Sequence, residues 1–141
     1  MTAWFAALVT WWGTLLGPGD TAEECLLLGR LDAERAHAFV QADVDRLAAV
    51  YASDGLRERD VEVLEDYAER SLRLEGMAQL RSSCRVVERD RDRVVLDVVD
   101  RLGPTRAVAR GAGHTLPSDE PTRRLVTLED TANGWRVVAS R

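Results

Sequence analysis

The sequence predicts an α+β fold in which N-terminal helices pack on one face of a curved antiparallel sheet. Apolar residues recur at helical spacing as far as Leu72, and from Met77 onward the pattern alternates as it does in strands. The strongest β-branched run covers residues 93–102, and an Asn133-Gly134 pair marks a tight hairpin near the end. Helices followed by consecutive strands are typical of α+β proteins.

The composition of the chain argues against several classes of function. The chain has 141 residues, enough for one domain with a hydrophobic core. Its net charge is -5, and all 19 of its basic residues are arginines. This balance argues against nucleic acid as a partner, because little positive charge is available to displace phosphate counterions. No residues have metal-ligand spacing and no glycine-rich loop could hold a nucleotide, so we expect neither a metal nor a cofactor.

The stretch from Met1 to Gly17 is apolar on all sides and carries no charge. We therefore divide the chain into an apolar segment, residues 1–19, and a domain, residues 20–141. A helix without a polar face must be covered by lipid or by protein. The stretch is slightly shorter than the roughly 20 residues that span a bilayer. Two interpretations stay open: membrane association, or docking on the domain's own surface or in a homodimer interface.

Three acidic residues follow that segment, Asp20, Glu23 and Glu24. They favour placing the domain outside the cytoplasm, with a cytoplasmic domain as the alternative. Cys25 and Cys84 are far apart and match no metal motif. They are either two buried thiols or one disulfide, depending on the compartment, and we favour buried thiols.

Three helices are expected before the strands. The first covers residues 21–42, with Thr21 and Glu24 forming a capping box. Asp43 caps a short second helix that ends at the turn residues 53–55. Asp60 caps a third helix that continues to about Leu72, with its apolar residues on one face.

Five strands are expected after the helices. The alternating runs are separated by turn residues, and residues 111–121 read as a loop rich in glycine and proline. The expected strands are residues 79–89, 93–102, 106–110, 122–131 and 135–140.

The candidate catalytic residues are two carboxylates of the central strand, Asp97 and Asp100. They lie on opposite faces because side chains alternate along a strand, so only one can point into the interior. A carboxylate desolvated among valines would have a raised pKa and could act as a general base. Beside Tyr51 or Tyr67, such an acid would suit proton abstraction or hydration chemistry.

The alternative is that both carboxylates form ion pairs with arginines across the sheet. Neighbouring strands supply four arginines at suitable positions, and buried carboxylates are usually paired. We favour this alternative. The four arginines are Arg81, Arg85, Arg123 and Arg124.

Two stretches resemble the NTF2-like superfamily, which has a cone-shaped α+β fold and includes SnoaL-like proteins and ketosteroid isomerase. Residues 31–39 with Asp43, followed by residues 47–52, resemble its opening helix, acidic break and short helix ending in tyrosine. Residues 125–128 and Gly134-Trp135-Arg136 resemble its closing hairpin. The resemblance covers residues 22–141 and implies the cone fold. The chain is also similar to a group of small actinobacterial proteins of unassigned function, often preceded by a membrane segment.

The chain also departs from the superfamily's pattern. Between Tyr51 and Asp60 there is room only for a loop, where many members have a short strand pair. The tyrosine and two aspartates of ketosteroid isomerase do not map residue by residue, so no catalytic assignment is carried over. We therefore expect a non-catalytic domain, tethered by its apolar segment, that binds a small apolar ligand or a protein. The alternative is a SnoaL-like isomerase, lyase or hydrolase that uses a pocket carboxylate as general base.

Overall fold

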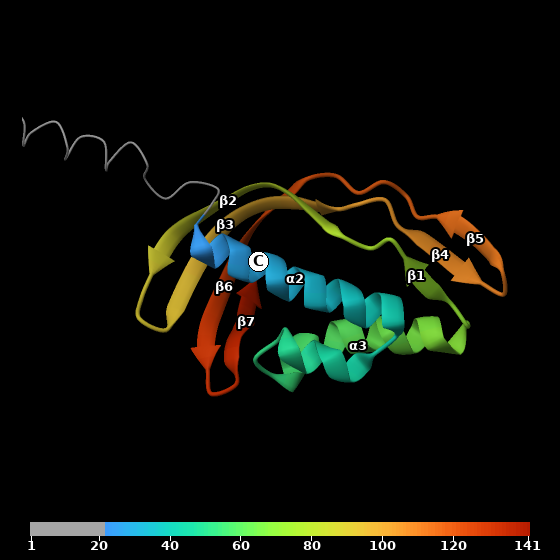
Figure 1. Ribbon diagram of the computed structural model, residues 1–141, viewed down its shortest axis with the longest axis horizontal. Coiled ribbons are helices and arrows are strands. Elements are labelled where there is room, and N and C mark those ends of the chain that lie inside the picture. The colour runs from blue at the N-terminus through green and yellow to red at the C-terminus, as the bar shows by residue number, and fades with distance from the viewer. Residues whose placement is uncertain (1–21) are drawn as a thin grey trace, which may run out of the picture.

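The computed structural model describes residues 22–141. The apolar segment and Thr21 of the expected capping box lie outside the described residues. The described part of the chain has three helices followed by seven strands, which is the α+β order expected from the sequence. In Figure 1 the helices lie on one side of the strands.

The helices are α2 (Glu23–Gln41), the 3-10 helix η1 (Val44–Ala49) and α3 (Asp54–Glu69). The first two agree with the expected positions, but α3 begins six residues before the predicted cap at Asp60. Its cap is Ser53, whose Oγ accepts a hydrogen bond from the backbone N–H of Leu56 at 3.4 Å. The turn residues 53–55 therefore start α3 instead of ending the preceding helix. Most of the loop expected between Tyr51 and Asp60 is helix.

Every expected strand is present, and two short strands were not expected. All pairings between these strands are antiparallel. Ala112–Thr115, expected to be loop, is an exposed strand without apolar alternation, and Arg73–Glu75 is too short to give a pattern. The strands are β1 (Arg73–Glu75), β2 (Gln79–Arg89), β3 (Arg93–Leu102), β4 (Arg106–Ala109), β5 (Ala112–Thr115), β6 (Thr122–Thr131) and β7 (Gly134–Ser140).

The strands form two hydrogen-bonded sheets, where the sequence suggested a single layer. The large sheet has the order β2-β3-β6-β7 and the small sheet the order β1-β4-β5. They separate where Gly103-Pro104 interrupts the chain between β3 and β4, since proline has no N–H to donate to a ladder. Helix α2 runs from the large sheet to the small one, and α3 lies beneath its C-terminal half (Figure 1).

Each sheet has its own core beneath α2. In the large-sheet core, Cys25, Leu28 and Leu31 of α2 pack on side chains of all four strands. In the small-sheet core, Ala38 and Phe39 of the same helix pack with residues of η1, α3, β1 and β4. The fully buried side chains include Leu28, Leu47, Leu96, Val98 and Leu128.

Two connections fix the helical layer to the large sheet. Cys25 of α2 and Cys84 of β2 form a disulfide with their Cα atoms 6.1 Å apart, so the preference for free thiols is wrong. At the opposite edge, Tyr51 forms a parallel bridge with Val137 of β7. The N–H of Val137 donates to Val50 O at 2.8 Å, and the N–H of Ala52 donates to Val137 O at 3.0 Å. Part of the β7 edge is thereby closed.

Candidate functional site

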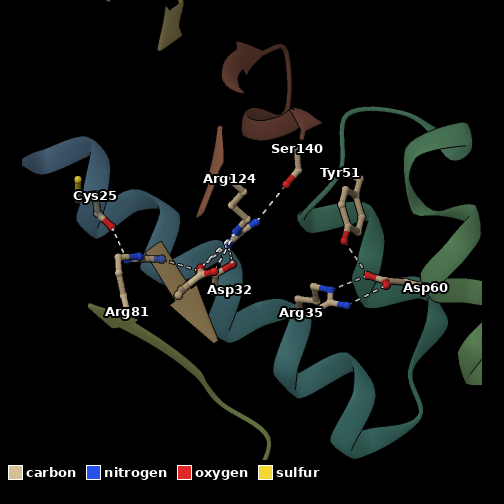
Figure 2. Close-up of polar contacts among 9 residues, drawn as sticks. Cys25, Asp32, Arg35, Tyr51, Asp60, Arg81, Arg124 and Ser140 are labelled. Carbon is tan, nitrogen blue, oxygen red and sulfur yellow. Dashed lines mark hydrogen bonds and ion pairs between the residues drawn. The ribbon is translucent and has the colours of Figure 1, made fainter. Parts of the chain in front are cut away.

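A cluster of three polar side chains joins α2, the end of η1 and α3. We call Arg35, Tyr51 and Asp60 the polar latch (Figure 2). Arg35 donates from Nε to one carboxylate oxygen of Asp60 at 2.7 Å and from Nη2 to the other at 2.9 Å. The Tyr51 hydroxyl donates to Asp60 Oδ2 at 2.7 Å. Asp60 therefore accepts three hydrogen bonds from two different elements.

The surroundings of the latch set its pKa values. Burial alone would raise the pKa of Asp60, but the hydrogen bonds and charge of Arg35, with the Tyr51 hydroxyl, outweigh it and lower this pKa. Burial raises the pKa of Tyr51 to about 12, opposed by the charge of Arg35 and assisted by the hydrogen bond to Asp60. Asp60 is thus an ionised carboxylate held by three hydrogen bonds, and Tyr51 is a weak acid. Neither is prepared to exchange a proton near neutral pH.

Sequence reasoning placed Tyr51 near a carboxylate but did not identify Asp60 as that carboxylate. Asp60 read as a helix cap because it precedes an apolar run. Asp60 lies within α3, and its partner Arg35 lies in α2, 25 residues away in the sequence. No local pattern indicates a pairing between positions so far apart. Only the packing of α2 against α3 brings these side chains together.

Removing latch groups should destabilise the domain in a graded way. Tyr51→Phe deletes one hydrogen bond and is expected to lower the free energy of unfolding by about 1 kcal/mol. Asp60→Asn also removes the charge that pairs with Arg35, and the expected loss is about 2 kcal/mol because the arginine is partly exposed. Urea unfolding of the two variants measures both values. Equal and negligible losses would contradict the structural role of the latch.

A second polar network links α2 to the core-facing side of the large sheet. Asp100 of β3 is buried, and Arg124 of β6 donates to it from Nε at 3.1 Å and from Nη2 at 2.7 Å. Arg124 Nη2 also lies 3.7 Å from Asp32 Oδ1. Arg81 Nη2 donates to the other oxygen of Asp32 at 2.5 Å. Figure 2 shows the two arginines on either side of Asp32.

The charges within this network balance one another, because it contains two carboxylates and two guanidinium groups. Burial raises the pKa of Asp32, although the positive charges of Arg124 and Arg81 partly offset this effect. Arg81 Nη1 also donates to the Cys25 carbonyl at 3.2 Å, while its Nε is buried without a hydrogen-bond partner among the described residues. The network therefore connects α2, β2, β3 and β6 beside the disulfide.

Asp97 lies on the other face of β3, away from the helices. Arg123 of β6 donates to it from Nε at 2.9 Å and from Nη2 at 2.7 Å, and Arg85 of β2 donates from Nη2 at 3.1 Å. The two hydrogen bonds from Arg123, with the one from Arg85, outweigh desolvation and lower the pKa of Asp97. Asp97 is held as a carboxylate between two largely exposed arginines.

The four candidate residues therefore lie in four different surroundings. Asp97 and Asp100 lie on opposite faces, as strand alternation predicts, and each is ion-paired. Tyr51 contacts Asp60 rather than either strand aspartate, and Tyr67 packs beside the small-sheet core. The structure brings no tyrosine into hydrogen-bond contact with Asp97 or Asp100 among the described residues. All four arginines named from the sequence contact a carboxylate, although Arg81 pairs with Asp32 of α2.

Three hollows on the surface have defined linings. One of about 320 Å³ lies around Leu27 and Trp135, and one of about 230 Å³ lies between α2 and the start of β2. The third, of about 660 Å³, lies between η1 and α3. None of these three linings includes Asp97, Asp100, Tyr51 or Tyr67. Within residues 22–141, no group of His, Cys, Asp and Glu side chains is arranged to hold a metal ion.

In the described part of the chain, no helix is both long enough and apolar enough to cross a membrane.

Comparisons with known proteins show similarity at the level of fold. No protein-family model matches the chain, and no curated protein matches it by sequence. The crystal structure of the intermembrane-space region of the chloroplast protein ARC6 aligns with a TM-score of 0.57 and 10% identity, covering 81% of this chain and 88% of that one. An NTF2-like protein with a cystatin-like fold from Novosphingobium aromaticivorans aligns with a TM-score of 0.50 and 13% identity. That alignment covers 99% of this chain and 89% of the other. The chain therefore has the NTF2-like fold that its sequence resembles.

Proposed function

We propose that the chain is a non-catalytic binding domain, tethered by its apolar N-terminal segment, that recognises another protein. The observation that carries this proposal is the pairing of its carboxylates. Asp60, Asp97 and Asp100 each accept at least two hydrogen bonds from arginine. A general base needs a carboxylate whose lone pairs are free to reach a substrate proton. These three aspartates instead act as ionic connections between elements.

Packing of the interior favours a protein over a small apolar ligand as the partner. The space between α2 and the large sheet is occupied by leucine and valine side chains, of which Leu28, Leu96 and Val98 are at most 1% exposed. A small-molecule site requires a cavity of several hundred cubic ångströms. The largest of the three hollows described above lies outside this interior, on the helical surface.

The disulfide supports a location outside the cytoplasm. Disulfides persist in oxidising compartments and are rare where thiols are kept reduced. The acidic residues that follow the apolar segment favour the same side of a membrane. The ARC6 region with the similar fold lies in an intermembrane space, so the fold also occurs beside a membrane in another protein. We place the domain on the oxidising side, attached through residues 1–19.

The alternative function, an isomerase, lyase or hydrolase with a pocket carboxylate, has weaker support. It requires Asp97 or Asp100 at the base of a pocket beside a tyrosine. Asp97 lies on the outer face between Arg85 and Arg123, and Asp100 is bonded to Arg124 beneath α2. The only contact between a tyrosine hydroxyl and a carboxylate in the described residues is in the latch, where Arg35 holds Asp60.

Expression in a bacterial host with an exported fusion tests the tether and the disulfide of this proposal. The full chain should sediment with membranes and show no thiol alkylation until it is reduced, while residues 20–141 alone should be a soluble monomer. Val9→Arg in the full chain is the matched control, because a charge in the middle of the segment opposes insertion by about 2.5–3.5 kcal/mol. A full chain that is soluble and monomeric would contradict the tether, and thiols that are freely alkylated after export would contradict the disulfide on which the proposed location rests.

A further inference from the structure

The largest of the three hollows is a groove between η1 and α3 that none of the contacts above uses. We call it the helical groove. It measures about 660 Å³ and is open to the surface. Val44 and Ala48 of η1 face Gly55 and Val61 of α3 across it. Its charged lining residues are Asp45, Asp54, Arg57 and Glu58.

The apolar part of the helical groove continues into the protein core. Val44 and Val61 are half-buried and pack against the small-sheet core. Ala48 and Gly55 are exposed and small, and a Cβ atom added at Gly55 would meet no atom within 4 Å. An aliphatic side chain placed here would extend the core by covering both valines. Burial of that apolar surface would favour binding.

The rim of the helical groove is acidic. It carries three carboxylates and one guanidinium, and Arg57 is already paired with Asp54 at 2.5 Å. Asp45 and Glu58 form no ion pair within residues 22–141. Beyond the groove, the exposed surface of α3 carries more carboxylates than arginines, so the local field favours positive charge. The carboxylates include Glu62, Glu65 and Glu69, and the arginine is Arg59.

We propose that the helical groove docks a short segment of a partner protein that carries an aliphatic side chain next to an arginine or lysine. The aliphatic side chain covers Val44 and Val61, and the basic side chain lies toward Asp45 and Glu58. This inference rests on the proposed protein-binding function and names the surface and the chemistry of its partner. The groove is small, so the contact is of the weak, transient class unless the partner also touches neighbouring surface.

Selection from a random peptide library displayed on phage tests the proposal directly. The bait is the full chain with its disulfide intact, in detergent micelles, and the counter-selection bait is Gly55→Trp. Tryptophan at this open position fills the groove, whereas the matched control Val87→Trp, at an exposed position of β2 away from the groove, should leave binding unchanged. Peptides enriched on the bait should combine aliphatic with basic residues and should lose at least tenfold in affinity for Gly55→Trp.

A second set of variants tests the charges. Asp45→Asn and Glu58→Gln should each weaken the enriched peptides about fivefold at low salt, the upper range for an exposed ion pair, and by less at high salt. Glu88→Gln on β2 makes the same charge change away from the groove and should have no effect. If Gly55→Trp lowers the melting temperature, Ala48→Trp is used in its place, because it fills the groove from the opposite wall.

The alternative outcomes separate this inference from the proposed function. Peptides that bind Gly55→Trp and the original chain equally well would overturn the groove and leave protein binding standing. Groove-dependent peptides without basic residues would overturn the partner chemistry proposed here. Self-association that is abolished by Gly55→Trp would show that a second copy of the chain occupies the groove. That result would also overturn the proposal of a different partner protein. A library that yields no binder would count against both proposals.

Discussion

Reduction of the Cys25–Cys84 disulfide is expected to lower the free energy of unfolding by about 4 kcal/mol. The bond closes a loop with a sequence separation of 59, and a loop of this length restricts the unfolded chain strongly. Both cysteines are 3% exposed and lie in the large-sheet core, where they fix the first turn of α2 to β2. A loss of this size approaches the whole stability of a typical domain. The reduced chain should therefore be partly unfolded at physiological temperature.

Urea unfolding with and without a reductant measures this effect. The double variant Cys25→Ser/Cys84→Ser is the matched control, because it lacks the bond under both conditions and should not respond to the reductant. A change of less than about 1 kcal/mol on reduction would contradict the role of the disulfide.

Asp100→Asn is expected to lower the free energy of unfolding by about 3 kcal/mol. The substitution leaves the Arg124 guanidinium beneath α2 without its main partner. The carboxylate that remains near it is Asp32, 3.7 Å from Nη2, and Nη1 keeps its hydrogen bond to the neutral Ser140 hydroxyl at 3.3 Å. Losing one member of a buried ion pair is expensive because the other charge stays desolvated. Replacing both members, as in Asp100→Leu/Arg124→Leu, should cost less than the two single losses together.

A double-mutant cycle over Asp100 and Arg124 separates a structural from a catalytic role. A structural pair gives a coupling energy of at least about 1 kcal/mol. The exposed Arg73–Glu75 pair serves as the control cycle, and its expected coupling energy is near zero because solvent screens both charges. Unchanged or increased stability in Asp100→Asn would indicate an acid kept for chemistry at the expense of stability.

Sequence patterns predicted those parts of the fold that depend on local periodicity. The valine run of β3, the Asn133-Gly134 hairpin and the apolar stripe of α2 each carry a signal within a few residues. The start of α3 was missed because Ser53 is a typical residue both after a helix and before one. The strands β1 and β5 were missed because neither is long enough, or apolar enough, to alternate visibly.

The candidate site was predicted only in part, since ion pairing depends on which elements become neighbours. Strand alternation was enough to place Asp97 and Asp100 on opposite faces and to name the arginines nearby. It gave no indication that Arg81 would reach Asp32 of α2 or that Arg35 would bind Asp60 of α3. Both contacts require the packing of α2 on the sheet and on α3. The disulfide has the same origin, because its cysteines are adjacent only in the folded chain.

Acid should destabilise the domain through the same carboxylates. The pKa values of Asp60 and Asp97 are lowered by folding, so each contributes stability above the pKa of an unfolded aspartate, about 3.9. That contribution is lost as the pH falls through the folded values. Asp32 acts in the opposite direction, because burial raises its pKa. We expect stability to fall below about pH 4, and less steeply in Asp60→Asn.

Titration of the aspartate side-chain carboxyl carbons by NMR is the most direct test of whether the paired carboxylates are structural. Assignment of Asp60 and Asp97 follows from the spectra of Asp60→Asn and Asp97→Asn. If arginines hold these groups as ionised acceptors, both titrate below the ordinary aspartate value of about 3.9. A pKa raised toward neutrality at either residue would identify a carboxylate prepared to take up a proton, and would contradict a non-catalytic domain.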